Sequence, residues 1–206
     1  MSNVFDAYLF ASVFITLFVI MDPPGVVPIF LGLTGAMTRQ QRNRAARQAV
    51  LVALGVIVAF ALFGQSLLDY MHITLPALQA SGGLLLLLIA MELLTGKMDT
   101  NEGYEGTQGN VALVPLGTPL LAGPGAIVAT MVYVQQSTEP SDWVALGLGI
   151  VLVHLCLWLS MRFAGSIHRV LKDSGTMLVS RIAGLLLAAI AVQLLADAVM
   201  TFAREI

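Results

Sequence analysis

Residues 19–25, Val-Ile-Met-Asp-Pro-Pro-Gly, place an acid and two prolines inside the first long apolar segment of the chain. One hundred residues after Pro24 and Gly25, the same pair recurs as Pro124 and Gly125 inside another apolar segment. A carboxylate and a helix break are both costly within a bilayer, so each needs a structural or functional reason. Their recurrence at corresponding places in two halves is typical of transporters built from repeats.

The composition favours a membrane protein. Of the 206 residues, 58% are apolar and only 11% are charged, which is too little charge to cover a water-soluble domain. The net charge of −2 gives no basic surface for nucleic acid. Cys156 is the only cysteine, which excludes an intramolecular disulfide and a metal site built from cysteines. We therefore expect the lipid bilayer as the main partner, with no metal and no bound cofactor.

The hydropathy pattern predicts six membrane-spanning helices. Each apolar stretch is about 18–26 residues long, which is enough to cross a bilayer. We take residues 1–206 as a single all-α integral membrane domain. The predicted segments are 8–33, 45–68, 77–95, 111–134, 143–163 and 178–202.

The six segments divide into two halves of three. We assign residues 1–96 to the first repeat, 97–110 to a linker loop and 111–206 to the second repeat. The sequence Gly83-Leu-Leu-Leu-Leu-Leu-Ile-Ala-Met-Glu92 aligns with Gly184-Leu-Leu-Leu-Ala-Ala-Ile-Ala-Val-Gln193 at nearly the offset of the proline breaks. Because each half has an odd number of helices, the second half enters the membrane upside down. The prediction is two inverted repeats in which helices 1 and 4 are interrupted.

Basic residues predict the orientation of these helices. Nine of the ten Lys and Arg residues fall on one side of the predicted membrane, and only Arg204 falls on the other. The positive-inside rule then places both termini outside. Thr38 and Gln41 have the spacing of a capping box, which predicts that the second helix starts in water beside the arginines. We interpret the arginine cluster as a topological anchor.

The proline breaks predict a binding site for a small zwitterion. Proline has no N–H, so it frees the carbonyl four residues earlier, and the half-helix beyond it offers N–H groups and a positive dipole end. Half-helix N-termini would take a carboxylate, while the freed carbonyls and Asp22 would take an ammonium group or a coupling cation. The predicted site residues are Asp22, Pro23, Pro24 and Gly25 in one half and Gly123, Pro124 and Gly125 in the other.

The same residues also permit purely structural roles. The breaks could be proline kinks satisfied by neighbouring helices, and Asp22 could cap the half-helix that follows it. A second set of polar or repeat-related positions could line the site or serve helix packing. This set is Val26, Ala126, Ser81, Glu92, Thr118, Thr130 and Gln193.

The motifs now assembled resemble the MarC family of small bacterial and archaeal inner-membrane proteins. Asp22-Pro-Pro-Gly-Val-Val-Pro28 is similar to the family's Asp-Pro-x-Gly-Asn-x-Pro signature, although Val26 stands where many relatives carry asparagine. Pro115-Leu-Gly-Thr-Pro119-Leu-Leu-Ala-Gly-Pro-Gly125 resembles its fourth-helix signature, and residues 181–193 resemble its final helix. The resemblance implies a six-helix protein of the plasma membrane, related to LysE-type exporters and often classed as a transporter of small neutral amino acids.

Residues and resemblance together predict a secondary transporter for a small neutral amino acid such as glycine or alanine, coupled to protons or sodium. The alternatives are a non-transporting membrane partner or regulatory protein, acting through the loop from Gly96 to Asn110, and an exporter of another small solute. An enzyme is not expected, because no nucleophile–base pair stands at one depth: His154 and Cys156 fall on different faces of one helix. The oligomeric state is left open.

Overall fold

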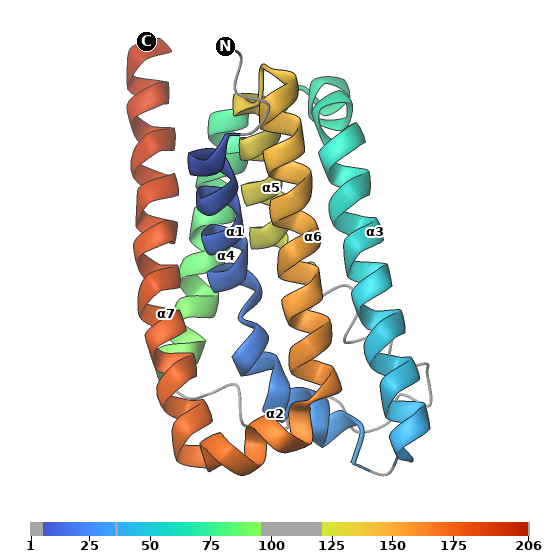
Figure 1. Ribbon diagram of the computed structural model, residues 1–206. Coiled ribbons are helices and arrows are strands. Elements are labelled where there is room, and N and C mark those ends of the chain that lie inside the picture. Colours follow the sequence, from blue (N-terminus) through green and yellow to red (C-terminus); the bar gives the residue numbers. More distant parts are fainter. Residues whose placement is uncertain (1–5, 36, 96–120, 206) are drawn as a thin grey trace.

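The computed structural model describes residues 6–35, 37–95 and 121–205, and every regular element in these ranges is a helix (Figure 1). The linker assigned to 97–110 and the first part of the fourth segment, with Thr118, lie outside the described residues. The helices are α1 (Ala7–Met21), α2 (Pro23–Leu33), α3 (Arg39–Met71), α4 (Leu75–Thr95), α5 (Pro124–Gln136), α6 (Pro140–Arg162) and α7 (Ala164–Glu205).

Five helical stretches in the described part are long and apolar enough to cross a membrane. They are Ala7–Leu33, Arg39–Met71, Leu75–Thr95, Pro140–Arg162 and Met177–Arg204, and they coincide with five of the six predicted segments. The fourth segment is described only from Leu121, and its helix α5 has 13 residues, which is short of a full span. The complete six-span arrangement therefore stays a prediction.

The first span is broken where the prolines predict. Asp22 has φ 40° and ψ 66°, a left-handed conformation that ends α1 and allows α2 to begin at Pro23. Pro23 and Pro24 have no N–H to donate to the carbonyls of Val19 and Ile20, so the helical ladder cannot continue through them. The prediction that helix 1 is interrupted is confirmed.

Two predictions for the end of the bundle that is expected to face the cytoplasm have different outcomes, one at the start of α3 and one at the start of α7. The Thr38 capping box is confirmed: Gln41 N–H donates to Thr38 Oγ1 at 3.3 Å, and Thr38 N–H donates to Gln41 Oε1 at 2.9 Å. The polar stretch between segments five and six, however, is helical rather than a loop. It forms the start of α7, with a kink at Lys172 (φ 54°, ψ −178°) that redirects the chain into the last span.

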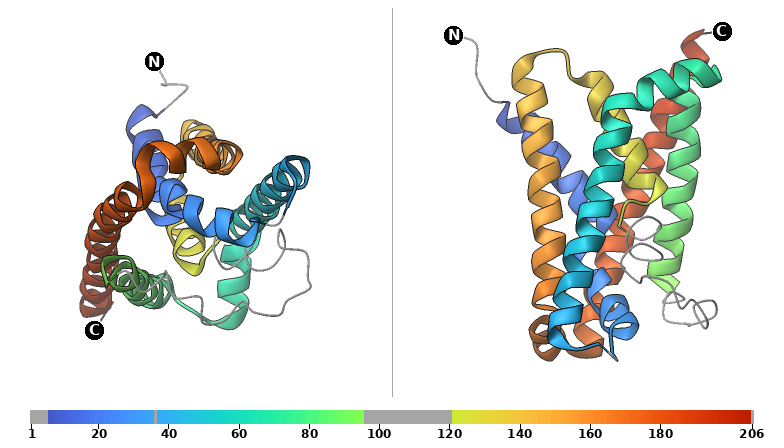
Figure 2. Two further views of the ribbon diagram at one scale, coloured as in Figure 1. Left: turned by 90° about the horizontal axis from the view of Figure 1, so that it is seen from below. Right: turned by 90° about the vertical axis from the view of Figure 1, so that its right-hand side faces the viewer.

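The two helices joined at Asp22, and helix α5, occupy the centre of the bundle. Seen along the helix axes, α1, α2 and α5 lie in the middle, and α3, α4, α6 and α7 surround them (Figure 2). The main apolar core joins α1, α2, α3, α5 and α6, and a second cluster joins α4 to α7. Thr16 Oγ1 and Tyr133 OH share a hydrogen bond of 2.9 Å between α1 and α5. Both predicted breaks are thus held at the centre of the protein.

Helices α4 and α7 are antiparallel neighbours with a reciprocal contact (Figure 1). A methyl group added at Gly83 would lie 2.9 Å from the Ala191 carbonyl oxygen and 3.0 Å from Leu195 Cγ. One added at Gly184 would lie 3.2 Å from the Ala90 carbonyl oxygen and 3.3 Å from Leu94 Cγ. Each contact maps onto the other when 101 is added to the residue number on α4 and subtracted from the residue number on α7, which is the reciprocity expected across a two-fold axis. This relation supports the alignment of the third helices of the two halves.

The two ends of the bundle differ in charge. The N- and C-terminal ends of the described chain lie at one end of the bundle (Figure 1). The start of α3, the end of α6 and the start of α7 lie at the opposite end, and they carry Arg39, Arg42, Arg44, Arg47, Arg162, Arg169 and Lys172. We call this the arginine-bearing end. Its position relative to the termini agrees with the predicted grouping of basic residues.

Candidate functional site

A cavity of about 270 Å³ lies where α1 gives way to α2 and where α5 begins. Six of its lining residues belong to the predicted site or to the second set, and they come from both halves of the chain. These are Asp22, Val26, Glu92, Gly123, Gly125 and Ala126. The structure therefore brings the two predicted breaks together around one space.

Asp22 is the buried charge of this cavity, with 9% of its surface exposed. Its backbone N–H donates to the Phe18 carbonyl at 3.0 Å, which closes the last turn of α1. Its Oδ1 accepts a hydrogen bond of 3.2 Å from Gly25 N–H, so the carboxylate caps α2. The carboxylate lies at the positive dipole end of α2 and retains acceptor capacity beyond this one bond.

The start of α5 is built differently. Gly123 is the N-cap residue in an extended conformation (φ −62°, ψ 164°) and has no side chain with which to cap the helix. Pro124 has no N–H, so Gly125 is the first residue of α5 that can donate. Gly123, Gly125 and Ala126 all line the cavity. Two helix starts therefore lie at the cavity: the start of α2 is capped by a carboxylate, and the start of α5 has no side-chain cap.

Glu92 adds a second carboxylate to the cavity wall. It lies on α4 one turn before the end of that helix at Thr95, and its side chain is exposed, whereas Asp22 is buried. The thirteen lining residues within the described part of the chain include these two acids and no Lys, Arg or His. The electrostatics of the cavity thus favour a cation or an ammonium group beside Asp22.

The remaining predicted residues that the structure describes lie outside the lining. Pro23 is buried, Pro24 and Gly25 are half-buried, and Pro124 is exposed. The hydroxyls of the second set bond to their own helices: Ser81 Oγ donates to the Leu78 carbonyl at 2.9 Å, and Thr130 Oγ1 donates to the Ala126 carbonyl at 2.7 Å. The exposed Gln193 donates to Asp197 Oδ1 at 2.8 Å.

Seven apolar residues that line the cavity were not predicted from the sequence. They are Ile20, Met21, Ile29, Leu86, Ile89, Leu93 and Leu121. In a chain where most segments are rich in leucine and isoleucine, residue type does not separate a residue that lines a cavity from one that faces lipid. Only proximity to the breaks, as at Ile20, Met21 and Leu121, offers a signal in the sequence.

The closeness of Gly25 to Asp22 gives a test of the cap. A methyl group added at Gly25 would overlap the Asp22 carboxylate, whereas one added at Gly32 on the same helix has no neighbour within 4 Å. Gly25→Ala is expected to displace the capping carboxylate and lower the free energy of unfolding by about 1 kcal/mol. Gly32→Ala should raise it by roughly 0.5 kcal/mol, because alanine loses less backbone entropy in a helix. Unfolding by SDS in mixed micelles measures both, and equal stability of the two variants would contradict the cap.

Comparison with known proteins places the chain in a family. The model of the MarC family integral membrane proteins matches residues 7–203. A UPF0056 membrane protein of Methanocaldococcus jannaschii is 35% identical over 201 residues, covering 94% of this chain and 97% of the relative. The UPF0056 membrane protein YhcE of Escherichia coli K12 is 32% identical, covering 92% and 91%. The UPF0056 inner membrane protein MarC of Escherichia coli O1:K1 is 30% identical, covering 90% and 91%.

These relatives are bacterial and archaeal, and their names state a membrane location and no activity. No solved structure matches the chain. The family match covers nearly every described residue, including the break at Asp22, the start of α5 and the cavity between them. The chain belongs to the MarC family of integral membrane proteins.

Proposed function

We propose that this protein is a secondary transporter of small neutral amino acids, such as glycine or alanine, in a bacterial or archaeal plasma membrane. The observation that carries the proposal is the cavity between the break at Asp22 and the start of α5, which is lined by a buried carboxylate and by a helix start without a side-chain cap. Broken helices at a central site are the arrangement by which many transporters bind polar solutes within the membrane.

The two walls suit the two ends of a zwitterion. The substrate carboxylate would lie at the start of α5, where the Gly125 N–H and the positive end of the helix dipole would stabilise its negative charge. The substrate ammonium would lie at Asp22, beside the carbonyls of Val19 and Ile20 that the prolines leave without helical donors. A zwitterion would thereby satisfy polar groups that are costly to leave unpaired in a bilayer.

The cavity size supports a small substrate. Its volume of about 270 Å³ falls just below the range of roughly 300–1,000 Å³ in which proteins bind larger ligands. Most of the wall consists of branched apolar side chains and glycine, with few polar groups beyond the two carboxylates. These features favour an amino acid whose side chain is absent or a single methyl group.

The second carboxylate supports coupling to a cation. A zwitterion has no net charge, so it leaves the two negative charges of Asp22 and Glu92 without a balancing positive charge from the described lining residues. A proton or a sodium ion entering with the substrate would reduce this imbalance. We therefore propose gradient-driven transport, with both termini outside and the arginine-bearing end inside.

Uptake by reconstituted protein tests the proposal. Purified protein in liposomes would be given labelled glycine, alanine or leucine under an imposed proton or sodium gradient, with protein-free liposomes as the control. We expect saturable uptake of glycine and alanine that stops when one of the two gradients is dissipated, and little uptake of leucine. An absence of glycine and alanine uptake above the control, from protein with intact helical circular dichroism, would overturn the proposed substrate class.

A further inference from the structure

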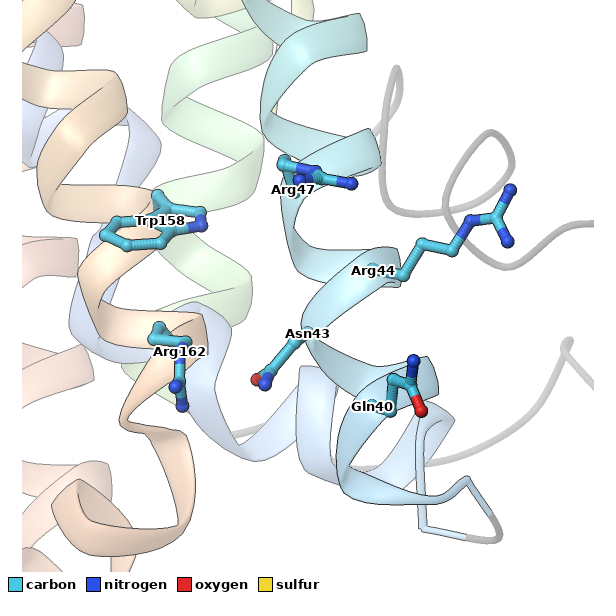
Figure 3. A pocket seen from close by; sticks show the side chains of 6 residues that line it. All are labelled: Gln40, Asn43, Arg44, Arg47, Trp158 and Arg162. Carbon is cyan, nitrogen blue, oxygen red and sulfur yellow. The ribbon is translucent and has the colours of Figure 1, made fainter.

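A second pocket lies at the arginine-bearing end, and the proposed transport does not use it. It is a space of about 280 Å³ between α3 and α6 (Figure 3). Its six lining residues are all polar or aromatic: Gln40, Asn43, Arg44, Arg47, Trp158 and Arg162.

Helical spacing explains why these side chains share one space. Gln40, Asn43, Arg44 and Arg47 follow the i, i+3, i+4, i+7 pattern, which places them on one face of α3. Trp158 and Arg162 are four residues apart and share one face of α6. Asn43 and Arg162 point toward each other between the helices, whereas the Arg44 side chain points away from α6 (Figure 3).

The positive charge of the pocket favours the binding of an anion. Among the residues that the structure describes, the lining carries three guanidinium groups and no carboxylate, in a protein whose net charge is −2. Guanidinium groups can form paired hydrogen bonds to two phosphate oxygens, and the side-chain amides of Gln40 and Asn43 offer further N–H donors. A phosphate group matches this set of donors better than a halide or a single carboxylate would.

The position of the pocket favours a lipid as the source of that phosphate. Helix α3 begins at Arg39, before the predicted apolar segment 45–68. Gln40, Asn43 and Arg44 precede this segment and Arg47 lies at its start, so the first three turns of α3 reach the headgroup region at the arginine-bearing end. Trp158 is of the residue type enriched at this interface.

We propose that this pocket binds the phosphate of an anionic lipid headgroup from the leaflet at the arginine-bearing end. Topological anchoring needs only positive charge anywhere near this surface, whereas the pocket needs these three arginines at these positions. The two roles are separable, because Arg39, Arg169 and Arg181 provide equal charge outside the pocket lining.

Native mass spectrometry of the full chain in mild detergent tests the site, with phosphatidylglycerol and phosphatidylcholine as probes. We expect the wild type to prefer phosphatidylglycerol. The triple variant Arg44→Gln, Arg47→Gln, Arg162→Gln should bind it roughly 100-fold more weakly, at about a factor of five for each basic residue. The matched triple Arg39→Gln, Arg169→Gln, Arg181→Gln should stay within about threefold of the wild type. Equal losses in the two triples would reduce the effect to overall charge and overturn the site.

Two further measurements separate the pocket from a folding defect and from a site for free phosphate. If the glutamine triple does not fold, the triple variant Arg44→Lys, Arg47→Lys, Arg162→Lys keeps the charge and removes the planar guanidinium groups. Weaker phosphatidylglycerol binding supports the pocket, and wild-type binding by this variant overturns it. Inorganic phosphate, titrated as a competitor, separates the sources of the phosphate. Binding of inorganic phosphate without any preference for phosphatidylglycerol would overturn the lipid assignment.

Discussion

Asp22→Asn is expected to lower gradient-driven uptake of glycine and alanine strongly while leaving the fold intact. Asparagine has nearly the same shape as aspartate and is an equally good helix cap, so its side-chain oxygen can still accept from Gly25 N–H. What the variant loses is the negative charge facing the cavity. A hydrogen bond to a charged partner contributes roughly 1.5–3 kcal/mol, so uptake at low substrate concentration should fall by about 10- to 100-fold.

The controls separate charge from capping. Asp69→Asn is the matched variant, because Asp69 is exposed, lies outside the cavity and accepts a hydrogen bond of 3.0 Å from Gln65 Nε2. It should transport like the wild type. Asp22→Ala removes both charge and cap, so it should also lower the free energy of unfolding by about 1 kcal/mol. Wild-type uptake by a normally inserted Asp22→Asn protein would remove this carboxylate from the mechanism and leave it a cap.

The sequence was most informative where a residue's chemistry forbids an alternative. Proline cannot donate a hydrogen bond, so the break at Asp22 and the helix start at Pro124 follow directly from residue type. The Thr38 cap followed from the same kind of argument, because the first turn of α3 needs acceptors for its N–H groups. The five described spans followed from length and hydropathy.

The sequence was least informative where residue type permits two environments. Ser81 and Thr130 could have faced the cavity, but each hydroxyl bonds to a carbonyl of its own helix, an option always open to these residues in a helix. The polar stretch after Arg162 lies outside the membrane segments predicted from hydropathy, yet it is helical, and α7 changes direction within it at Lys172. Leu86 contributes to the cavity through its position opposite Gly125, which residue type alone does not reveal.

The sequence contains a helical spacing pattern for one wall of the basic pocket, and a count of arginines does not reveal it. Counting arginines predicts only which end faces the cytoplasm, and all members of the cluster are equal in that count. The spacing of Gln40, Asn43, Arg44 and Arg47 already assigned these four to one helix face. The opposite wall could not be assigned, because the packing of α6 against this face depends on the tertiary fold.

Gly83→Ala and Gly184→Ala are each expected to destabilise the protein, and by similar amounts. A methyl group at either position would meet a backbone carbonyl and leucine carbons of the facing helix at 2.9–3.3 Å, so α4 and α7 would have to move apart. Overpacking of this kind costs roughly 1–3 kcal/mol. The similar size of the two effects follows from the reciprocal contact, in which Gly83 meets Ala191 and Gly184 meets Ala90.

Alanine substitutions at other helical glycines are matched controls, because they are not expected to destabilise the protein. Gly55 and Gly147 are also helical, but an added methyl group at either has no neighbour within 4 Å, so alanine there should be neutral or stabilise by roughly 0.5 kcal/mol. Unfolding by SDS in mixed micelles, followed by circular dichroism, measures all four variants. If only one of Gly83→Ala and Gly184→Ala destabilised, the two-fold relation between α4 and α7 would fail. Because those helices are the third of each predicted half, the case for two repeats would then rest on the proline breaks alone.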